Sequence, residues 1–366
     1  MADKKKLLCV IGQLGNGGSE KQLYLFLKYQ TKYELAVFVT GPNEGLWSEK
    51  IQKKLNCKIF FTGRTSKLNK ILQYRMILKS FAPDIIFSWS FFTNILVYFS
   101  GKRDFIGSLR QQFSDENAAS WSTRMCLSSR MKQIVVNSLY IKKELIEFGV
   151  PDSKVAVVYN VFETGDDGDF FKFQKSFMRR KLFVQYQIPE NSIVVMGVGR
   201  NSKVKNFSFF IDVIEAAVKI NPKIYAVIVG SGGSAFEEEI TRRNLDECIT
   251  LTGEVPYAQK YLFAADIFFL SSLKEGMPNV LIESVYAGCT PFATDVAGVR
   301  DVFQFLSKDI VENIIINDFS VDSAAKKLVE LISNHKIRSE SQRNARKFLD
   351  KLTPETVMEE FDKILE

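Results

Sequence analysis

Two glutamates, Glu275 and Glu283, flank the expected start of a helix in the second half of the chain. An apolar strand over residues 266–272 ends in a turn that carries Glu275 and Gly276, and helical periodicity begins near Asn279. A helix start presents backbone N–H groups and a positive dipole end, which can hold a phosphate. Carboxylates on both sides can accept hydrogen bonds from the hydroxyls of a sugar and of a ribose. The alternative is that both acids only complement the helix dipole, worth about 0.3–1 kcal/mol each.

Two cations, Arg200 and Lys205, follow another expected strand, over residues 192–199, and precede an expected helix over 206–220. Arginine can donate two parallel hydrogen bonds to a phosphate, and lysine acts on it as a point charge. This pattern suits a diphosphate, and the alternative is a solvated basic loop.

Glycine-rich turns occur twice between a strand and a helix. The first, GQLGNGGSE, contains Gly17 and Gly18, and its glycines allow a ligand to approach the backbone closely. It is not a Walker A loop, because no Lys-Ser/Thr pair follows at the required spacing. The second, GSGGSA, begins at Gly230 and fits the degenerate dinucleotide pattern G-x-G-x-x-A, with Glu254 downstream. It is the best argument for an NAD-dependent oxidoreductase, although it lies on the second strand of its half instead of the first.

Metal and nucleophile chemistry has little support. Asp167 and Asp169 form a D-x-D pair, but the surrounding ETGDDGD favours an acidic linker turn. The single histidine, His335, lies in a polar stretch and is expected at an exposed helix end. The five cysteines contain no C-x-x-C pair and are an odd number, which argues against a disulfide framework or a structural zinc site and fits a reducing cytoplasm.

Charge is distributed unevenly along the 366 residues. Residues 1–165 hold 24 Lys+Arg against 13 Asp+Glu, whereas residues 166–366 hold 25 against 29. A basic first half suggests an anionic partner such as lipid headgroups or a phosphorylated acceptor, and the alternative is a solvated basic surface. Nucleic acid is the weakest candidate, because no nucleic-acid-binding motif occurs. The longest uncharged run, residues 85–100, is too short and polar to span a membrane. We expect a cytoplasmic protein that can touch the inner face of an anionic membrane.

Short apolar runs alternate with helical patterns, which predicts βαβ units around parallel sheets. The expected strands cover residues 6–12, 33–41, 58–63, 84–89, 105–109, 133–138, 155–160, 192–199, 223–232, 249–253, 266–272 and 290–295. The expected helices include 18–30, 68–81, 138–148, 206–220, 234–244, 257–265, 279–287 and 354–366.

A break of linker composition at 163–169 coincides with the change of charge sign. It divides the chain into a first domain, residues 1–165, and a second domain, residues 166–353. The final helix, 354–366, is a candidate to pack back on the first domain. The fold class is therefore α/β, with two Rossmann-like, doubly wound domains facing across a cleft.

Together, these motifs resemble the retaining glycosyltransferases of family 4 ("glycosyl transferases group 1"), which have the GT-B fold. EGMPNVLIE is similar to the family's E-x7-E motif, with Glu275 and Glu283 as its acids, and GRNSKVKN is similar to its R-x4-K element. GNGGSEKQ resembles the glycine loop of the acceptor domain, and the stretch from Asn137 to Asn160 resembles the segment before the interdomain linker. The similarity runs from about residue 7 to 302.

The resemblance implies a nucleotide-diphosphate sugar as donor, with UDP-sugar the first choice, and no metal or other cofactor. Glu275, Arg200 and Lys205 would be catalytic, and the leaving phosphate oxygen would take the acceptor proton during front-face attack. Glu283 would hold the ribose. The donor-binding residues implied are Gly17, Gly18, Gly230, Glu254, Val255, Gly276, Asn279, Val280, Leu281 and Glu283.

The acceptor implied is a hydroxyl of a glycan or lipid-linked sugar, in bacterial surface polysaccharide synthesis. The chain departs from the family on this side: it has Ser88-Trp89-Ser90 where a histidine is common, and Val161 where a glycine follows Asn160. Acceptor contacts are therefore not carried over. Open alternatives are an NAD-dependent oxidoreductase, a non-catalytic nucleotide-sugar-binding protein, and a GT-B epimerase or phosphorylase.

Overall fold

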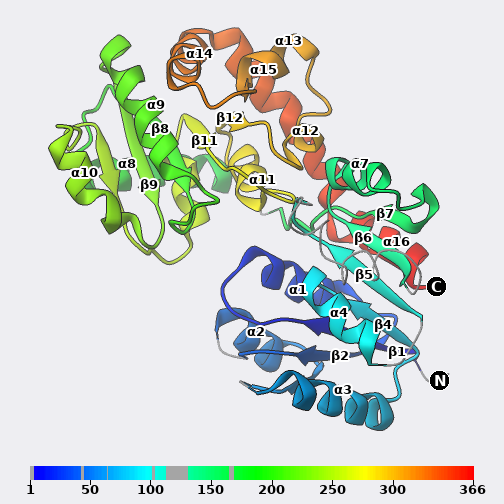
Figure 1. Cartoon of the computed structure of the whole chain (residues 1–366). Helices are drawn as coiled ribbons and strands as arrows, with labels where there is room; N and C mark the ends of the chain where they lie inside the picture. The colour runs from blue at the N-terminus through cyan, green and yellow to red at the C-terminus, as the bar shows by residue number, and fades with distance from the viewer. Residues whose placement is uncertain (1–3, 43–44, 64, 101–103, 113–130, 165–168) are drawn as a thin grey trace. The chain divides into compact units, whose positions relative to one another are not determined.

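The chain folds into two compact units (Figure 1). The computed structural model describes residues 4–42, 45–63, 65–100, 104–112, 131–164 and 169–366, and for residues 169–170 only the backbone. Unit 1 consists of Met1–Glu163 and Leu352–Glu366, and unit 2 of Thr164–Lys351. The two Rossmann-like domains expected from the sequence are confirmed.

Unit 1 is built on a parallel sheet in the order β3-β2-β1-β4-β5-β6-β7. Its strands are β1 (Lys6–Ile11), β2 (Glu34–Val39), β3 (Lys58–Phe61), β4 (Ile85–Ser88), β5 (Phe105–Leu109), β6 (Met131–Val136) and β7 (Val155–Val157). They are short apolar runs, as expected for strands that helices cover on both faces. The strand order reverses between β1 and β4, which is where doubly wound sheets bind ligands.

Three helices of unit 1 start at a residue whose side chain caps them. Ser66, Ser138 and Thr353 each accept a backbone N–H in the first turn of the helix that follows, and Pro354 takes the first helical position of the last one. The α-helices described are α1 (Gly18–Tyr29), α2 (Leu46–Lys54), α3 (Lys67–Phe81), α4 (Phe91–Phe99), α7 (Leu139–Glu147) and α16 (Pro354–Leu365), and a short 3₁₀ turn spans Asp152–Lys154.

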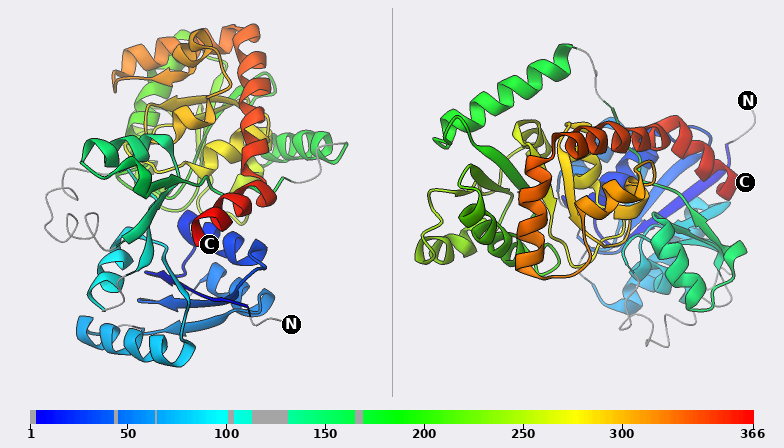
Figure 2. Two further views of the ribbon diagram at one scale, coloured as in Figure 1. Left: turned by 90° about the vertical axis from the view of Figure 1, so that its right-hand side faces the viewer. Right: turned by 90° about the horizontal axis from the view of Figure 1, so that it is seen from above.

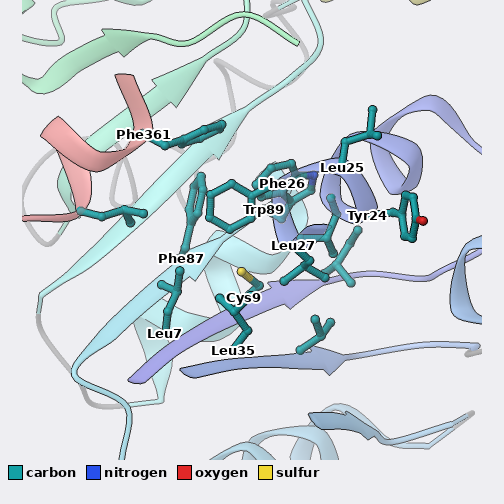
Figure 3. Close-up of a cluster of buried hydrophobic side chains, with 14 of the residues drawn as sticks. Leu7, Cys9, Tyr24, Leu25, Phe26, Leu27, Leu35, Phe87, Trp89 and Phe361 are labelled. Atoms are coloured by element: carbon teal, nitrogen blue, oxygen red, sulfur yellow. The ribbon is translucent and has the colours of Figure 1, made fainter. Parts of the chain in front are cut away.

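The C-terminal helix α16 packs against α1 in unit 1 (Figure 2), and an aromatic cluster fixes it there (Figure 3). Phe361 of α16 lies with its ring centroid 4.8 Å from that of Phe26 in α1 and 5.9 Å from that of Phe87 in β4. Trp89 completes the group, 5.3 Å from Phe26, and is 1% exposed. The last helix is thus part of the core of the first unit, although 188 residues of unit 2 precede it in the chain.

Unit 2 contains a parallel sheet in the order β10-β9-β8-β11-β12-β13. Its strands are β8 (Ile193–Val198), β9 (Ile224–Val229), β10 (Ile249–Leu251), β11 (Ile267–Leu270), β12 (Thr290–Thr294) and β13 (Ile315–Ile316). The order reverses between β8 and β11, so the switch point of this sheet lies between the strands that precede the two candidate motifs.

The helices of unit 2 include several that the sequence analysis did not predict. They are α8 (Asp169–Gln185), α9 (Phe207–Ile220), α10 (Glu237–Arg242), α11 (Asn279–Tyr286), α12 (Val299–Val302), α13 (Lys308–Ile314), α14 (Val321–Ser333) and α15 (His335–Arg346). His335 is exposed at the first position of α15, as expected. Asp167 lies outside the described residues, and Asp169 opens α8.

Two expected helices have a different form. The segment expected at 257–265 is a 3₁₀ helix, Ala258–Ala264, in which four successive residues from Tyr261 are buried, a pattern without the 3.6-residue period. The segment expected at 234–244 opens with a 3₁₀ turn, Gly233–Phe236, and becomes α-helical only in α10. A further 3₁₀ segment covers Lys347–Leu352. Within the described part of the chain, no helix has both the length and the apolar character needed to cross a membrane.

Candidate active site

The candidate residues of unit 2 gather at the carboxyl edge of its sheet. Gly199 and Arg200 follow β8, Gly230 follows β9, and Glu275 follows β11. Backbone hydrogen bonds join the strand ends, from Gly199 N–H to the Val229 carbonyl at 2.9 Å and from Gly230 N–H to the Gly253 carbonyl at 3.1 Å. Glu254 and Val255 come directly after Gly253. Residues from four strands therefore meet where doubly wound sheets bind ligands.

At this edge, Lys205 and Glu275 form an ion pair. Lys205 Nζ donates to Glu275 Oε1 at 2.6 Å, and the two side chains are 24% and 15% exposed. Ser272 Oγ donates to the same carboxylate oxygen at 2.7 Å. The pair joins the R-x4-K loop to the E-x7-E loop, and being only partly exposed it is less screened by water than a surface pair.

Hydrogen bonds to main-chain groups fix the two loops to each other. Ser271 Oγ donates to the Lys205 carbonyl at 2.8 Å, and Leu273 N–H donates to the Val204 carbonyl at 2.7 Å. Thr294 Oγ1, at the end of β12, donates to the Ser272 carbonyl at 2.6 Å. The position of Lys205 relative to Glu275 is thus set by the backbone as well as by charge.

Arg200 is placed differently from Lys205. It is exposed on the same loop, and within the described residues it makes no ion pair or hydrogen bond. Its guanidinium donors are therefore unpaired within the described residues, and a role of Arg200 toward a diphosphate stays a prediction.

Helix α11 begins at Asn279, as the sequence predicted, with Pro278 before it. Val280 is partly exposed in the first turn, and Glu283 is partly exposed one turn further on. Leu281 is wholly buried, and its N–H donates to the Pro278 carbonyl at 3.0 Å. Leu281 therefore packs in the core and supports the helix. In any α-helix the first backbone N–H groups have no acceptor within the helix, so here the N–H groups at the start of α11 are the ones that a phosphate would use.

Glycines let the loops of this edge approach one another. Gly230 has φ +140°, and a Cβ there would overlap the carbonyl oxygen of Gly199. Gly298, with φ +78°, lies against the buried Gly276, since its Cβ would be 2.7 Å from the Gly276 carbonyl oxygen. The sequence analysis did not single out Gly298, because its neighbours VAGVR give no sign of the distant contact.

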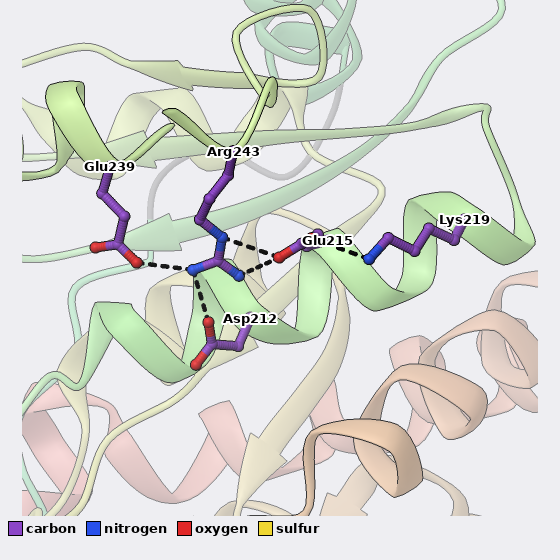
Figure 4. Close-up of polar contacts among 5 residues, drawn as sticks. All are labelled: Asp212, Glu215, Lys219, Glu239 and Arg243. Atoms are coloured by element: carbon purple, nitrogen blue, oxygen red, sulfur yellow. Dashed lines mark hydrogen bonds and ion pairs between the residues drawn. The ribbon is translucent and has the colours of Figure 1, made fainter. Parts of the chain in front are cut away.

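An ion network anchors the helix that follows the Gly230 loop (Figure 4). Arg243, just after α10, contacts Asp212 at 2.8 Å and Glu239 at 2.7 Å, and it also pairs with Glu215. Burial opposes the charged form of Arg243, but the hydrogen bonds to these acids outweigh it and raise its pKa. Because Asp212 and Glu215 belong to α9, the network ties α10 to α9.

In unit 1, a cavity of about 460 Å³ opens at the carboxyl ends of β1, β4 and β5. Gln13 Nε2 donates to Glu20 Oε1 at 3.2 Å on its wall. The cavity is lined by Ile11, Gly12, Gln13, Ser19, Glu20, Ser90, Phe91, Phe92, Arg110 and Gln111. This is the switch point of the first sheet, and its volume is in the range of small-molecule sites.

Gly17 and Gly18 directly precede Ser19 and Glu20, which line this cavity. Gly17 precedes α1, which starts at Gly18, and a Cβ on Gly17 would overlap the Glu20 carboxylate. The glycine therefore leaves room for Glu20, which is 6% exposed. A role of these two glycines toward the donor stays a prediction.

Comparison with protein families decides between the alternatives. The model of "Glycosyl transferases group 1" matches residues 178–348, and that of "Glycosyltransferase Family 4" matches residues 16–165.

The chain belongs to glycosyltransferase family 4.

Relatives of this glycosyltransferase span most of its length. The capsular polysaccharide biosynthesis glycosyltransferase CapH of Staphylococcus aureus is 24% identical, over 84% of this chain and 86% of the relative. The N-acetylgalactosamine-N,N'-diacetylbacillosaminyl-diphospho-undecaprenol 4-alpha-N-acetylgalactosaminyltransferase of Campylobacter jejuni is 23% identical, over 82% and 83%. Among solved structures, Anabaena HepE in complex with UDP and glucose aligns with a TM-score of 0.79 at 17% identity, covering 99% of both chains. This structural similarity shows the GT-B fold.

The enzyme class and the fold expected from the sequence are confirmed, and an oxidoreductase is not favoured. The structure brings Lys205 and Glu275 together, and places Gly17 and Gly18 in the other unit. The lining of the unit 1 cavity was missed, although the rule that ligands bind at the switch point could have pointed to Gln13 and Ser90. Within the described ranges, no three His, Cys, Asp or Glu side chains are grouped as metal ligands would be.

Proposed function

We propose that this glycosyltransferase moves a sugar from a nucleotide-diphosphate donor, most simply a UDP-sugar, to a hydroxyl of a glycan or lipid-linked acceptor, with retention of configuration. The Lys205–Glu275 pair at the switch point of unit 2 carries the proposal. The functions of the relatives named above support a place in bacterial polysaccharide synthesis, and the HepE complex with UDP supports UDP as the nucleotide.

In the proposed reaction, the bond between the sugar C1 and the diphosphate oxygen breaks and a bond from C1 to the acceptor oxygen forms on the same face. The acceptor proton passes to the leaving phosphate oxygen. Arg200 and Lys205 stabilise the charge that develops on the diphosphate, which is often the largest contribution to catalysis. Glu275 orients the transferred sugar, and Glu283 holds the ribose. Because two cations and a helix start can supply the positive charge, we propose that transfer needs no metal.

A thermal-shift screen of nucleotide-diphosphate sugars tests the donor. At a concentration of 100 Kd, the right donor should stabilise the protein by about 2.7 kcal/mol and raise its Tm. NAD serves as the matched control, because it offers a diphosphate and a ribose without a transferable sugar. A Tm raised by NAD and by no nucleotide sugar would overturn the proposal. Release of nucleotide only when an acceptor is present separates a transferase from a non-catalytic binding protein.

We also propose that unit 1 touches an anionic membrane through α3. Leu68, Leu72 and Met76 are 75%, 58% and 68% exposed and are spaced four residues apart, so they form one stripe on the helix. The helix KLNKILQYRMILKSF has four basic residues and no acidic one. An apolar stripe beside basic side chains is typical of helices that lie in a lipid interface.

Co-sedimentation with vesicles tests this surface. We expect the Leu72→Glu/Met76→Glu variant to bind phosphatidylglycerol vesicles at least tenfold more weakly than the unaltered protein, because two apolar contacts are replaced by charges that the lipid repels. Ile146→Glu is the control, since Ile146 is 39% exposed on α7 of the same unit. If the double variant bound phosphatidylglycerol vesicles as tightly as the unaltered protein, a role for α3 would be refuted. If the unaltered protein bound phosphatidylcholine vesicles equally well, the preference for an anionic membrane would be refuted.

A further inference from the structure

One wall of the unit 1 cavity carries a cation, the partly exposed Arg110. Arg110 follows β5, and its guanidinium carbon lies 3.9 Å from the ring centroid of Trp89. Its Nη1 donates to Asn160 Oδ1 at 3.3 Å, whereas Nε and Nη2 are covered and have no hydrogen-bond partner among the residues that the structure describes. In the part of the chain that the structure describes, no carboxylate forms an ion pair with Arg110.

Such an arrangement is unfavourable in the unliganded protein. Moving a charge out of water costs several kcal/mol unless an opposite charge and hydrogen bonds replace the water. Burial accordingly lowers the pKa of the Arg110 guanidinium to about 9, although the neighbouring Cys9 acts in the opposite direction. A bound anion would supply the opposite charge and the hydrogen bonds that Arg110 lacks.

The surroundings hold Arg110 firmly in place. Trp89 is 1% exposed, and its indole N–H donates to the Ser19 carbonyl at 3.1 Å. Phe87 lies with its ring centroid 5.1 Å from that of Trp89. The guanidinium therefore rests on a fixed aromatic platform. Nε and Nη2 form the edge that can donate two parallel hydrogen bonds to a carboxylate or phosphate. Both atoms are covered in the unliganded protein, so an anion in the cavity reaches them only when the groups around them move.

The rest of the cavity suits a sugar ring. Glu20, Gln13 and Ser90 offer acceptors and donors for hydroxyls, and Phe91 and Phe92 offer apolar faces. Glu20 lies on the α1 side, and Arg110 on the β5 side. The walls thus combine groups for a polar ring with one cation for a negative charge.

We propose that Arg110 makes this cavity select an acceptor sugar that carries a negative charge, a carboxylate or a phosphate. The inference deepens the proposed function and rests on it only in naming the ligand an acceptor. The anion compensates Arg110, and the hydroxyls of the ring are held by Glu20 and its neighbours.

Calorimetric titration tests the selection, with D-glucuronate, glucose 1-phosphate and neutral D-glucose as probes. We expect at least one charged sugar to bind ten or more times more tightly than glucose to the unaltered protein. Arg110→Gln should reduce that preference to about twofold or less. Arg75→Gln, which alters an exposed arginine of α3 in the same unit, should retain it. Preference for glucuronate alone assigns a carboxylate, and preference for glucose 1-phosphate alone assigns a phosphate.

Two results would overturn the proposal: charged sugars that bind no better than glucose, or a preference that survives Arg110→Gln. Glucose 1-phosphate can also bind unit 2, so the same titrations are made with Lys205→Gln, which should keep the part of the binding that depends on Arg110.

The Tm of unliganded Arg110→Gln should equal or exceed that of the unaltered protein, because the uncompensated charge is gone. A lower Tm would assign Arg110 to stability instead. If the protein binds charged sugars but no nucleotide sugar, this site stands and the proposed nucleotide-sugar donor is refuted.

Discussion

Lys205→Ala is expected to lower kcat/KM for sugar transfer about a hundredfold or more, while the protein stays folded. The substitution removes the cation that faces the leaving diphosphate in the proposed reaction. It also leaves Glu275 with the Ser272 hydroxyl as its remaining contact among those described above. The loss should appear mainly in kcat, because the charge that Lys205 opposes grows as the C1–O bond breaks.

Lys203→Ala is the matched control for this measurement. Lys203 lies two residues earlier on the same loop and is exposed, so its removal changes the local charge equally but breaks no described contact with Glu275. Transfer rates should fall less than threefold in the control. Equal rates for Lys205→Ala and the unaltered enzyme would remove Lys205 from the reaction, and with it the main support for the proposed function.

Glu275→Gln provides an independent view of the same pair. The amide keeps the shape of the side chain but removes the charge that holds Lys205 at 2.6 Å. Rates that fall in both single variants, and fall little further in the double variant, would show that the two residues act as a unit.

The sequence predicted the elements of this site but not their pairing. Apolar runs indicated β8 and β11, and the turn that contains Gly276 indicated the helix after it, for which the expected first residue, Asn279, is the first residue of α11. Lys205 and Glu275 are 70 residues apart, and their contact depends on β8 and β11 being neighbours at the switch point. Strand order is decided by packing of whole βαβ units, which local periodicity does not record. Only the resemblance to a family suggested that both loops serve one ligand.

In unit 1, the sequence offers no indication that Arg110 belongs to a candidate site. Arg110 stands alone after a five-residue strand, and nothing in its neighbours distinguishes it from a solvated arginine. Its surroundings become visible only when Trp89, after β4, and Asn160, after β7, are placed around it.

Helix α8 was also missed by the sequence analysis. Its basic residues and the exposed Phe173 and Phe177 obscure the amphipathic pattern that indicates a buried helix face.

Gly230→Ala is expected to have the second large effect, through the backbone beneath Arg200. The residue has φ +140°, where a Cβ alone costs about 1–3 kcal/mol. The added methyl would also overlap the Gly199 carbonyl, so the turn from β8 into the Arg200 loop must move. We therefore expect a Tm several degrees lower and donor binding at least tenfold weaker.

Gly233→Ala separates this effect from a general intolerance of the loop. A Cβ at Gly233 would meet Leu251 at 3.7 Å, an ordinary contact, and the residue has no positive φ. Its Tm and donor affinity should stay close to those of the unaltered enzyme. If Gly230→Ala lowered the Tm but left donor affinity unchanged, the glycine would serve only the fold of unit 2. If the folded variant bound the donor at least tenfold more weakly at a temperature well below its Tm, the close approach of Gly230 to Gly199 would be shown to position the cationic loop for the diphosphate.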